Sequence, residues 1–330
     1  MRPRSAFFAA LLLAAPAHAE TNVVRVAQQF GIGYLPLTVM RHEQLLEKEA
    51  ARAGLPDERV EWTQFGAGNA MNEALLSGRL DFPSGGVTVL LTIWSKTKGR
   101  QDIHGVAALN SMPLYLVSSN PKVASAKDLS EADRIGLPAV KVSIQAVTLE
   151  MAAARLFGQA QFGKFDALTV SLAHPDAMAA LMSGRSEINA HFGSPPFQYQ
   201  ELADPRMHRI VNSYDVTGGP HTFNVIWTSR KFHDENPKLY GAFLAALGEA
   251  MKLITSDPHR AAEIYVAEEN SKLAADFIEK MVRDPENRFT ALPENVERYG
   301  DFLAAIGAIE SKPARVQDLF FPELFSAQGR

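Results

Sequence analysis

Short apolar stretches alternate with segments whose apolar positions recur at helical spacing through the first third of the chain. Residues 23–29 and 60–65 are predicted strands, and residues 36–53 and 69–76 are the helices that follow them, with Asn69 as the N-cap of the second. Residues 80–82 are predicted to form the next strand and residues 87–96 the next helix. Strands that alternate with helices in this way predict an α/β protein with mostly parallel sheets.

The same alternation continues to about residue 228, and the remainder is predicted to be helical. Further strands are expected over 103–109, 114–118, 134–137, 167–172, 188–192 and 223–228, with helices over 149–157 and 177–182. After Pro237 the apolar residues fall on helical stripes, for example Leu239, Phe243, Leu247, Met251 and Ile254. These stripes indicate core packing rather than a functional site.

One nine-residue segment occurs twice. Residues 74–82 (Ala-Leu-Leu-Ser-Gly-Arg-Leu-Asp-Phe) match residues 180–188 (Ala-Leu-Met-Ser-Gly-Arg-Ser-Glu-Ile), with five of nine positions identical. Each copy follows a predicted strand and describes a helix that ends at a glycine and leads into another strand. The repeat predicts two similar lobes that face a cleft, although chance similarity between two helix ends would give the same pattern.

The N-terminal residues have the features of an export signal. Arg2 and Arg4 precede an apolar stretch over 6–16, and Ala17-His18-Ala19 is a small-residue cleavage site, so the mature chain is expected to begin at Glu20. The sequence contains no cysteine, which excludes a disulfide framework, a thiolate metal site, a cysteine nucleophile and an N-terminal lipid anchor. We therefore expect a soluble periplasmic protein.

Charge argues against two classes of partner. Loss of Arg2 and Arg4 changes the formal net charge from −4 to −6. This mildly acidic balance disfavours nucleic acid and anionic membranes as partners. The predicted partner is instead a small molecule.

Glycines and small polar residues lie where predicted strands end and helices begin. In open α/β sheets ligands bind at that edge, and the first turn of a helix offers free N–H groups to an anion. Strand alternation makes one of Gln28 and Gln29 buried and the other outward, so at most one of them is expected to contribute to the site. Asn69 and His191 also have purely structural interpretations. The candidates at these strand ends are Gln28, Gln29, Gly31, Gly33, Tyr34, Phe65, Gly66, Gly68, Asn69, Gly85, Gly86, Val87, Ser143, Gln145, Asn189, His191, Phe192 and Ser194.

Motifs for catalysis are absent from the sequence. The nine histidines form neither His-x-x-x-His nor His-Glu-x-x-His, and no Gly-x-Ser-x-Gly elbow occurs. Gly31-Ile-Gly33 lacks the third glycine of a dinucleotide-binding fingerprint, and no phosphate-binding loop is present. We expect no catalytic residue, no metal and no cofactor, which favours a binding protein over an enzyme.

Several segments together resemble a known family. They are residues 24–27, 31–34, 70–82, 85–86, 105–109, 127–129 and 180–185. In these segments the chain is similar to the periplasmic substrate-binding proteins of nitrate/sulfonate/taurine-type ABC importers, which are related to thiamine-pyrimidine-precursor binders. The resemblance implies a type II periplasmic-binding fold with a two-crossing hinge near residues 110–113 and 221–224. Lobe one would be residues 20–112 and 222–330, and lobe two residues 113–221.

The resemblance also implies a function and a set of ligand-binding residues. The protein would capture a small organic anion in the cleft, as a monomer, and deliver it to an ABC permease with its ATPase subunits. The loop 141–146 (Lys-Val-Ser-Ile-Gln-Ala) is bulkier than the Gly-Ser-Thr of many relatives, which argues against a simple oxyanion. The ligand-binding residues expected by position are Gln29, Gly31, Tyr34, Gly66, Gly68, Asn69, Gly85, Gly86, Val87, Ser143, Gln145, His191 and Phe192.

Two other functions remain open. The importer could carry a flat heteroaromatic such as a thiamine-precursor pyrimidine, which Phe and Tyr side chains at the loops would stack against. An enzyme that resembles the pyrimidine synthases is the third possible function. The lack of cysteine and the export signal disfavour it, because those enzymes carry Cys-rich segments and act in the cytosol.

Overall fold

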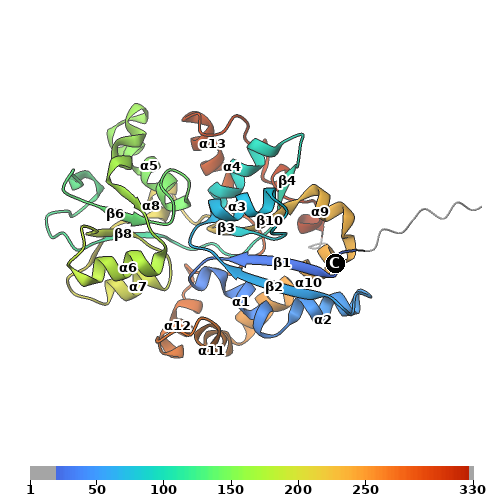
Figure 1. Cartoon of the computed structure of the whole chain (residues 1–330). Coiled ribbons are helices and arrows are strands. Elements are labelled where there is room, and N and C mark those ends of the chain that lie inside the picture. Colours follow the sequence, from blue (N-terminus) through green and yellow to red (C-terminus); the bar gives the residue numbers. More distant parts are fainter. Residues whose placement is uncertain (1–19, 327–330) are drawn as a thin grey trace, which may run out of the picture.

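The computed structural model describes residues 20–326, so the predicted export signal and its cleavage site lie outside the described residues. Figure 1 shows two α/β lobes side by side, with the green and yellow segments in one and the blue, orange and red segments mainly in the other. Within the described range, no helix combines the length and apolar character needed to span a membrane.

The first lobe is built on short strands contributed by distant parts of the chain. β1 (Val23–Gln28) pairs in parallel with β2 (Arg59–Gln64), and Val26 forms a parallel bridge to Phe82. β10 (Asn224–Ser229) lies between β3 (Ser84–Gly86) and β4 (Ile103–Ala108) and is antiparallel to both. The helices that connect these strands are η1 (Ile32–Tyr34), α1 (Leu35–His42), α2 (Leu45–Arg52), α3 (Gly68–Leu76) and α4 (Val87–Thr97).

The second lobe holds a five-stranded sheet in the order β7-β6-β8-β5-β9. β6 (Ile135–Leu137) is parallel to β7 (Thr169–Ser171) and β8 (Ala190–Phe192), whereas β5 (Tyr115–Ser118) is antiparallel to β8 and β9 (His208–Asn212). Its helices are η2 (Ala126–Asp128), α5 (Ile144–Phe157), η3 (Gln159–Leu168), α6 (His174–Ser183), α7 (Phe197–Leu202) and α8 (Ser213–Thr217).

The C-terminal part is helical, as the apolar stripes predict. Leu239, Phe243, Leu247 and Ile254 are buried on α10 (Pro237–Ser256), which packs against α1 and α2. The other C-terminal elements are α9 (Arg230–Glu235), α11 (Pro258–Glu268), α12 (Ala275–Val282), α13 (Val296–Ala305), η4 (Val316–Asp318) and α14 (Glu323–Ser326).

The expected α/β architecture is present, but the sheets are mixed rather than mostly parallel. β10 pairs antiparallel with both of its neighbours, as β5 does in the other lobe. A strand that runs parallel to its neighbour needs a crossover connection, usually a helix. β5 and β10 each follow a connection between the two lobes instead, and each runs antiparallel to its neighbours. Alternation of strands and helices in the sequence does not reveal this direction.

Several predicted elements have different bounds in the structure, and three of them differ most. The helix expected over 36–53 is two helices, α1 and α2, separated at Gln44, whose φ of 50° is left-handed. The strand expected over 80–82 is reduced to the bridge at Phe82. α5 begins at Ile144, earlier than expected, because the Ser143 hydroxyl caps it by accepting a hydrogen bond from the Ala146 N–H.

The repeated segment ends a helix in the same way in both lobes. Ser77 Oγ donates to Ala74 O at the end of α3, and Ser183 Oγ donates to Ala180 O at the end of α6. Gly78 and Gly184 follow with φ of 70° and 62°, the left-handed conformation that favours glycine. Because α3 follows β2 and α6 follows β7, the two copies occupy equivalent places.

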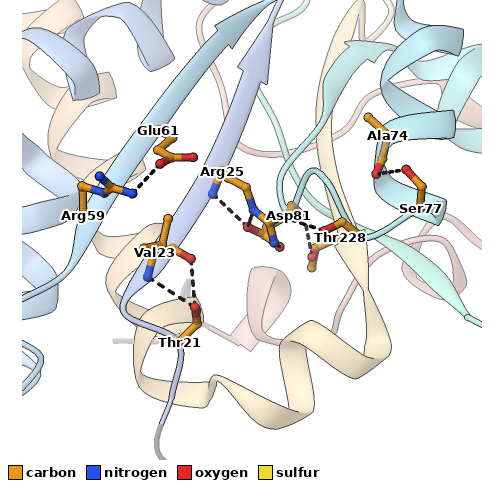
Figure 2. Close-up of polar contacts among 10 residues, drawn as sticks. Thr21, Val23, Arg25, Arg59, Glu61, Ala74, Ser77, Asp81 and Thr228 are labelled. Atoms are coloured by element: carbon orange, nitrogen blue, oxygen red, sulfur yellow. Dashed lines mark hydrogen bonds and ion pairs between the residues drawn. The ribbon is translucent and has the colours of Figure 1, made fainter.

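The first copy is also tied to its lobe by an ion pair that the second copy lacks. Figure 2 shows the Arg25 guanidinium against the Asp81 carboxylate, with Nε–Oδ2 and Nη2–Oδ1 distances of 2.9 Å each. Asp81 Oδ2 also accepts from the Arg25 backbone N–H, and Thr228 Oγ1 donates to Asp81 O. Asp81 is buried, whereas its counterpart Glu187 is exposed.

Asp81→Ala is expected to lower the free energy of unfolding by about 2–3 kcal/mol, because the Arg25 backbone N–H, Nε and Nη2 lose their acceptor and only Nη1 keeps one, at Gly78 O. Glu187→Ala is the matched control and should change stability by less than about 0.5 kcal/mol. Urea denaturation of both variants measures the difference. Equal losses would show that the ion pair does not stabilise this lobe.

Candidate functional site

A small cavity lies between the two lobes. Its volume is about 20 Å³, roughly enough for one water molecule. Its lining comes from loops and helix starts at the ends of the strands, which is where ligands bind in open α/β sheets. The lining residues are Gln29, Phe30, Tyr34, Gly68, Gly86, Val89 and Phe223 from the first lobe and Pro138, Ala139, Ser143, Ile144, Gln145 and His174 from the second.

The cavity is small because the lobes touch around it. Thr88 Oγ1 on α4 donates to Val142 O across the cleft at 2.9 Å, and the Ile32 N–H donates to Pro195 O at 3.1 Å. A Cβ placed on Gly86 would lie 2.9 Å from Ile144 Cγ2. The lobes therefore touch in this structure, and a ligand larger than water fits only if lining side chains move or the lobes separate.

Five helices begin at the wall of the cavity. Tyr34 is the N-cap of α1, Gly68 starts α3, Gly86 is the N-cap of α4, Ser143 is the N-cap of α5, and His174 starts α6. The first-turn N–H groups of a helix have no acceptor within it, and the helix dipole is positive at that end. No Lys, Arg, Asp or Glu among residues 20–326 lines the cavity. The Leu35 N–H of α1 and the Val87 N–H of α4 already donate to Ile32 O and Phe223 O, and the Ala146 N–H of α5 donates to Ser143 Oγ. The positive ends of the five helix dipoles still favour an anion at this wall.

The first-lobe wall carries a hydrogen-bonded pair, Gln29 and Tyr34. Gln29 Nε2 donates to Tyr34 Oη at 2.9 Å, and Tyr34 Oη donates to Asn224 Oδ1 at 3.1 Å. Burial raises the pKa of Tyr34 far above its usual value, so the phenol stays neutral. Asn110 Nδ2 donates to Gly33 O, which anchors the turn before Tyr34. The polar part of this wall is therefore uncharged, and its contact with Asn224 on β10 fixes it in place.

The second-lobe wall carries Gln145 and His174, whose Nε2 atoms are 3.2 Å apart. His174 Nδ1 is 2.8 Å from His191 Nε2, and His191 Nδ1 is 2.5 Å from Glu201 Oε1. Burial, reinforced by His191, lowers the pKa of His174 well below its usual value. His174 is therefore a neutral imidazole at the cavity.

Part of the predicted set lines the cavity. Ser143 lies in the wall, but its hydroxyl group is already hydrogen-bonded to neighbouring backbone groups. It donates to Ala139 O and accepts from the Ala146 N–H. Of the remaining predictions, the residues that the structure brings to the cavity are Gln29, Tyr34, Gly68, Gly86 and Gln145.

The other predicted residues do not line it. Gly66 and Asn69 are exposed, and Ala67 rather than Asn69 is the N-cap of α3, so the predicted capping role of Asn69 is wrong. Gly31 packs against Pro195 O, and Gly85 packs against Gln29 and Trp227. Val87, His191 and Phe192 are buried but do not line the cavity. The other candidates at strand ends do not line it either: Gln28, Gly33, Phe65, Asn189 and Ser194.

Several residues that line the cavity were not predicted from the sequence. His174 opens α6 just after a strand, so the rule that selected Gly86 and Ser143 applied to it as well. Phe223 reaches the cavity from the start of β10, far from the other loops in sequence, and no local pattern indicates it. The other missed residues are the apolar Phe30, Val89, Pro138, Ala139 and Ile144.

Away from the cavity, one cluster of the described residues has groups that could hold a metal ion. His259 Nδ1 is 2.7 Å from Glu279 Oε2, with Asp276 nearby on α12. The cluster lies mostly exposed on the surface, and neighbouring acidic groups on helices commonly occur without an ion. It forms no part of the cavity.

Solved structures of binding proteins match nearly the whole chain. The alkanesulfonate-binding protein SsuA from Xanthomonas axonopodis pv. citri, bound to MOPS, is 18% identical, covers 93% of this chain and 98% of its own, and has a TM-score of 0.69. The periplasmic aliphatic sulphonate binding protein SsuA from Escherichia coli is 20% identical, with 93% and 100% coverage and a TM-score of 0.65. The periplasmic nitrate-binding protein NrtA from Synechocystis PCC 6803 is 14% identical, with 94% and 89% coverage and a TM-score of 0.65.

These likenesses confirm the predicted two-lobed periplasmic-binding fold. No curated protein sequence matches this chain significantly. The model of the NMT1-like family matches residues 17–267, most of the chain, and the protein belongs to the NMT1-like family.

Proposed function

We propose that the protein is the solute-binding component of an ABC importer and captures a small organic anion of the sulfonate or nitrate type between its lobes. The observation that carries this proposal is the convergence of five helix N-termini on one cavity without any charged side chain in its lining. Backbone N–H groups from both lobes would hold the anionic group.

The walls favour an organic anion over an inorganic one. Phe30, Val89, Ile144 and Phe223 give the cavity apolar surface that a bare oxyanion would leave unused. A compact anionic group with a carbon-containing tail uses both kinds of surface. The alkanesulfonate and nitrate binders with this fold support the general class.

Closure is the proposed mechanism. The lobes, with proposed limits 20–112 plus 222–330 and 113–221, separate to admit the ligand and close when it bridges them. Contacts such as Thr88 to Val142 form only in the closed arrangement. A shift from mostly open to mostly closed requires about 5.5 kcal/mol of differential binding. The closed form would then dock on a membrane permease in the periplasm and release its ligand there.

The cavity is better suited to binding than to catalysis. Its titratable side chains, Tyr34 and His174, are both held neutral by burial. Neither faces a carboxylate in the lining, so the site lacks a charged acid–base pair. We infer that the ligand leaves chemically unchanged.

A thermal-shift screen with alkanesulfonates, nitrate, carboxylates and pyrimidines tests the proposal. A true ligand at about 100 times its dissociation constant adds roughly 2.7 kcal/mol to the free energy of unfolding. A sulfonate should give that stabilisation and nitrate a smaller one, and the bound compound should be recovered intact from the complex. Stabilisation by none of these compounds, or conversion of one into a product, would overturn the assignment.

A flat heteroaromatic ligand, such as a thiamine-precursor pyrimidine, is the second candidate. Phe30, Tyr34 and Phe223 all line the cavity and offer aromatic faces for stacking. The same screen separates the two candidates, because stabilisation by pyrimidines without any by sulfonates would select this one.

A further inference from the structure

A buried chain of side chains runs from the cavity into the second lobe. It connects Gln145 on α5, His174 on α6, His191 on β8 and Glu201 on α7 through contacts of 3.2, 2.8 and 2.5 Å. His191 and Glu201 are fully buried. The Phe197 ring stacks on the His174 ring, with the two ring centroids 5.5 Å apart. Only the Gln145 and His174 end of the chain reaches the cavity.

The contacts specify one direction of hydrogen bonding. Gln145 presents its amide nitrogen to His174 Nε2, so Nε2 accepts and the proton of the neutral ring lies on Nδ1. His174 Nδ1–H therefore donates to His191 Nε2, which places the His191 proton on Nδ1. That proton faces Glu201 Oε1, so the carboxyl oxygen accepts it and completes the chain. The Gln145 amide nitrogen thus sets the direction, and the hydrogen bonds continue in that direction as far as Glu201.

This direction determines what Gln145 offers the cavity. With one amide N–H given to His174, its carbonyl oxygen and second N–H have no hydrogen-bond partner among the described residues. The amide cannot rotate by 180° without placing its oxygen against the His174 Nε2 lone pair. The carbonyl oxygen is thus held as an acceptor on a wall where the helix N-termini supply only donors.

We propose that Glu201, His191 and His174 are positioning residues that fix Gln145 as a hydrogen-bond acceptor, and that the site thereby selects a ligand carrying an N–H donor beside its anionic or ring acceptor group. This inference rests on the proposed binding function and narrows its ligand class. An amine-bearing sulfonate and an aminopyrimidine both satisfy it, whereas nitrate and an unsubstituted alkanesulfonate do not.

The proton arrangement is tested first, without any ligand. Long-range ¹H–¹⁵N spectra of the ¹⁵N-histidine-labelled protein near pH 7 distinguish the two neutral tautomers and the charged form. His174→Phe and His191→Phe assign the signals. Both rings should be neutral and protonated on Nδ1. A proton on Nε2 alone, or a doubly protonated ring, at either position would overturn the proposal.

Selection is tested with two probe pairs that differ by one amine. The first is 2-aminoethanesulfonate against ethanesulfonate, and the second is 4-amino-2-methylpyrimidine against 2,4-dimethylpyrimidine. In whichever pair binds, calorimetry should show the amine-bearing member about tenfold tighter or more, the effect of one well-placed hydrogen bond. Equal affinities within that pair would contradict the proposal.

Glu201→Leu removes the carboxylate that accepts the His191 proton. Its His191 proton should move to Nε2, the chain should reverse, and the preference for the amine should be lost. Glu201→Gln, which can donate or accept, should reduce the preference less and serves if the leucine variant does not fold. The matched control is Glu268→Gln, which alters a carboxylate 2.8 Å from His42 Nδ1 away from the cavity. An unchanged preference in a folded Glu201 variant would overturn the proposal.

The proposed binding function and the proposed positioning role of Glu201, His191 and His174 can be refuted independently of each other. If none of the four probes binds, the proposed sulfonate and pyrimidine functions fail, and the histidine spectra still decide the hydrogen-bond direction. If probes bind but the spectra show the opposite tautomers, the binding function stands and the positioning role falls.

Discussion

Ser143→Asp is expected to weaken the binding of a sulfonate probe by on the order of 10²-fold and to leave the protein folded. Ser143 caps α5 at the cavity wall, and aspartate is as good an N-cap as serine, so the helix keeps its first-turn acceptor. The new carboxylate, however, lies where the ligand's anionic group would bind. Two like charges about 5 Å apart at an effective dielectric constant of about 20 repel by about 3 kcal/mol, which lowers affinity by on the order of 10²-fold.

Ser143→Asn is the control for this variant, since it keeps the capping acceptor and nearly the same shape without the charge. Its affinity for the sulfonate should stay within several-fold of the wild type. Titration calorimetry measures binding, and thermal unfolding confirms that both variants fold. Unchanged affinity in the aspartate variant would remove the 143–145 loop from the site. A loss for sulfonates together with normal pyrimidine binding would show that charge, not shape, causes the effect.

Gly86→Ala should weaken ligand binding by about tenfold or more through its effect on closure. The added methyl would lie 2.9 Å from Ile144 Cγ2 and 3.0 Å from Ile144 Cβ in the closed arrangement. Overpacking of this kind costs about 1–3 kcal/mol. The cost applies only when the lobes touch, and the Gly86 φ of −60° suits alanine, so the open protein should fold normally.

A second substitution identifies the clash as the cause. Ile144→Ala in the Gly86→Ala background removes the contact with Cγ2 and keeps the 3.0 Å contact with Cβ, so it should restore part of the lost affinity. Gly66→Ala is the control, because its Cβ would make an ordinary 3.4 Å contact with Ala173. Its affinity should be close to that of the wild type. If Ile144→Ala gives no recovery, contact between these two residues does not limit closure.

The sequence predicts the fold well where the signal is local. Alternating strands and helices establish the α/β class, and Ser77-Gly78 and Ser183-Gly184 mark helix ends that the structure reproduces in both lobes. The direction of β10 is not a local property, because it depends on where the chain returns to the first lobe. The break at Gln44 is likewise set by tertiary packing, since α2 packs against α10 and the segment carries no helix breaker.

The site was predictable only in part for the same reason. The rule that ligands meet helix starts after strands led to Gly68, Gly86 and Ser143, and it applied equally to His174. His191 was identified by its place at a strand end, but the structure puts it behind His174 and bonded to Glu201. The position of His191 depends on contacts with residues that are distant in the sequence. Such contacts cannot be predicted from a local sequence pattern.

The most direct measurement is the distance between the lobes with and without ligand. The sequence contains no cysteine, so Glu73→Cys on α3 and Ala179→Cys on α6, both exposed positions, accept a unique pair of spin labels. Pulsed electron paramagnetic resonance should show a broad or longer distance distribution in the free protein and a single shorter one with a saturating ligand from the thermal-shift screen. A distribution that the bound ligand leaves unchanged would contradict capture by closure of the two lobes.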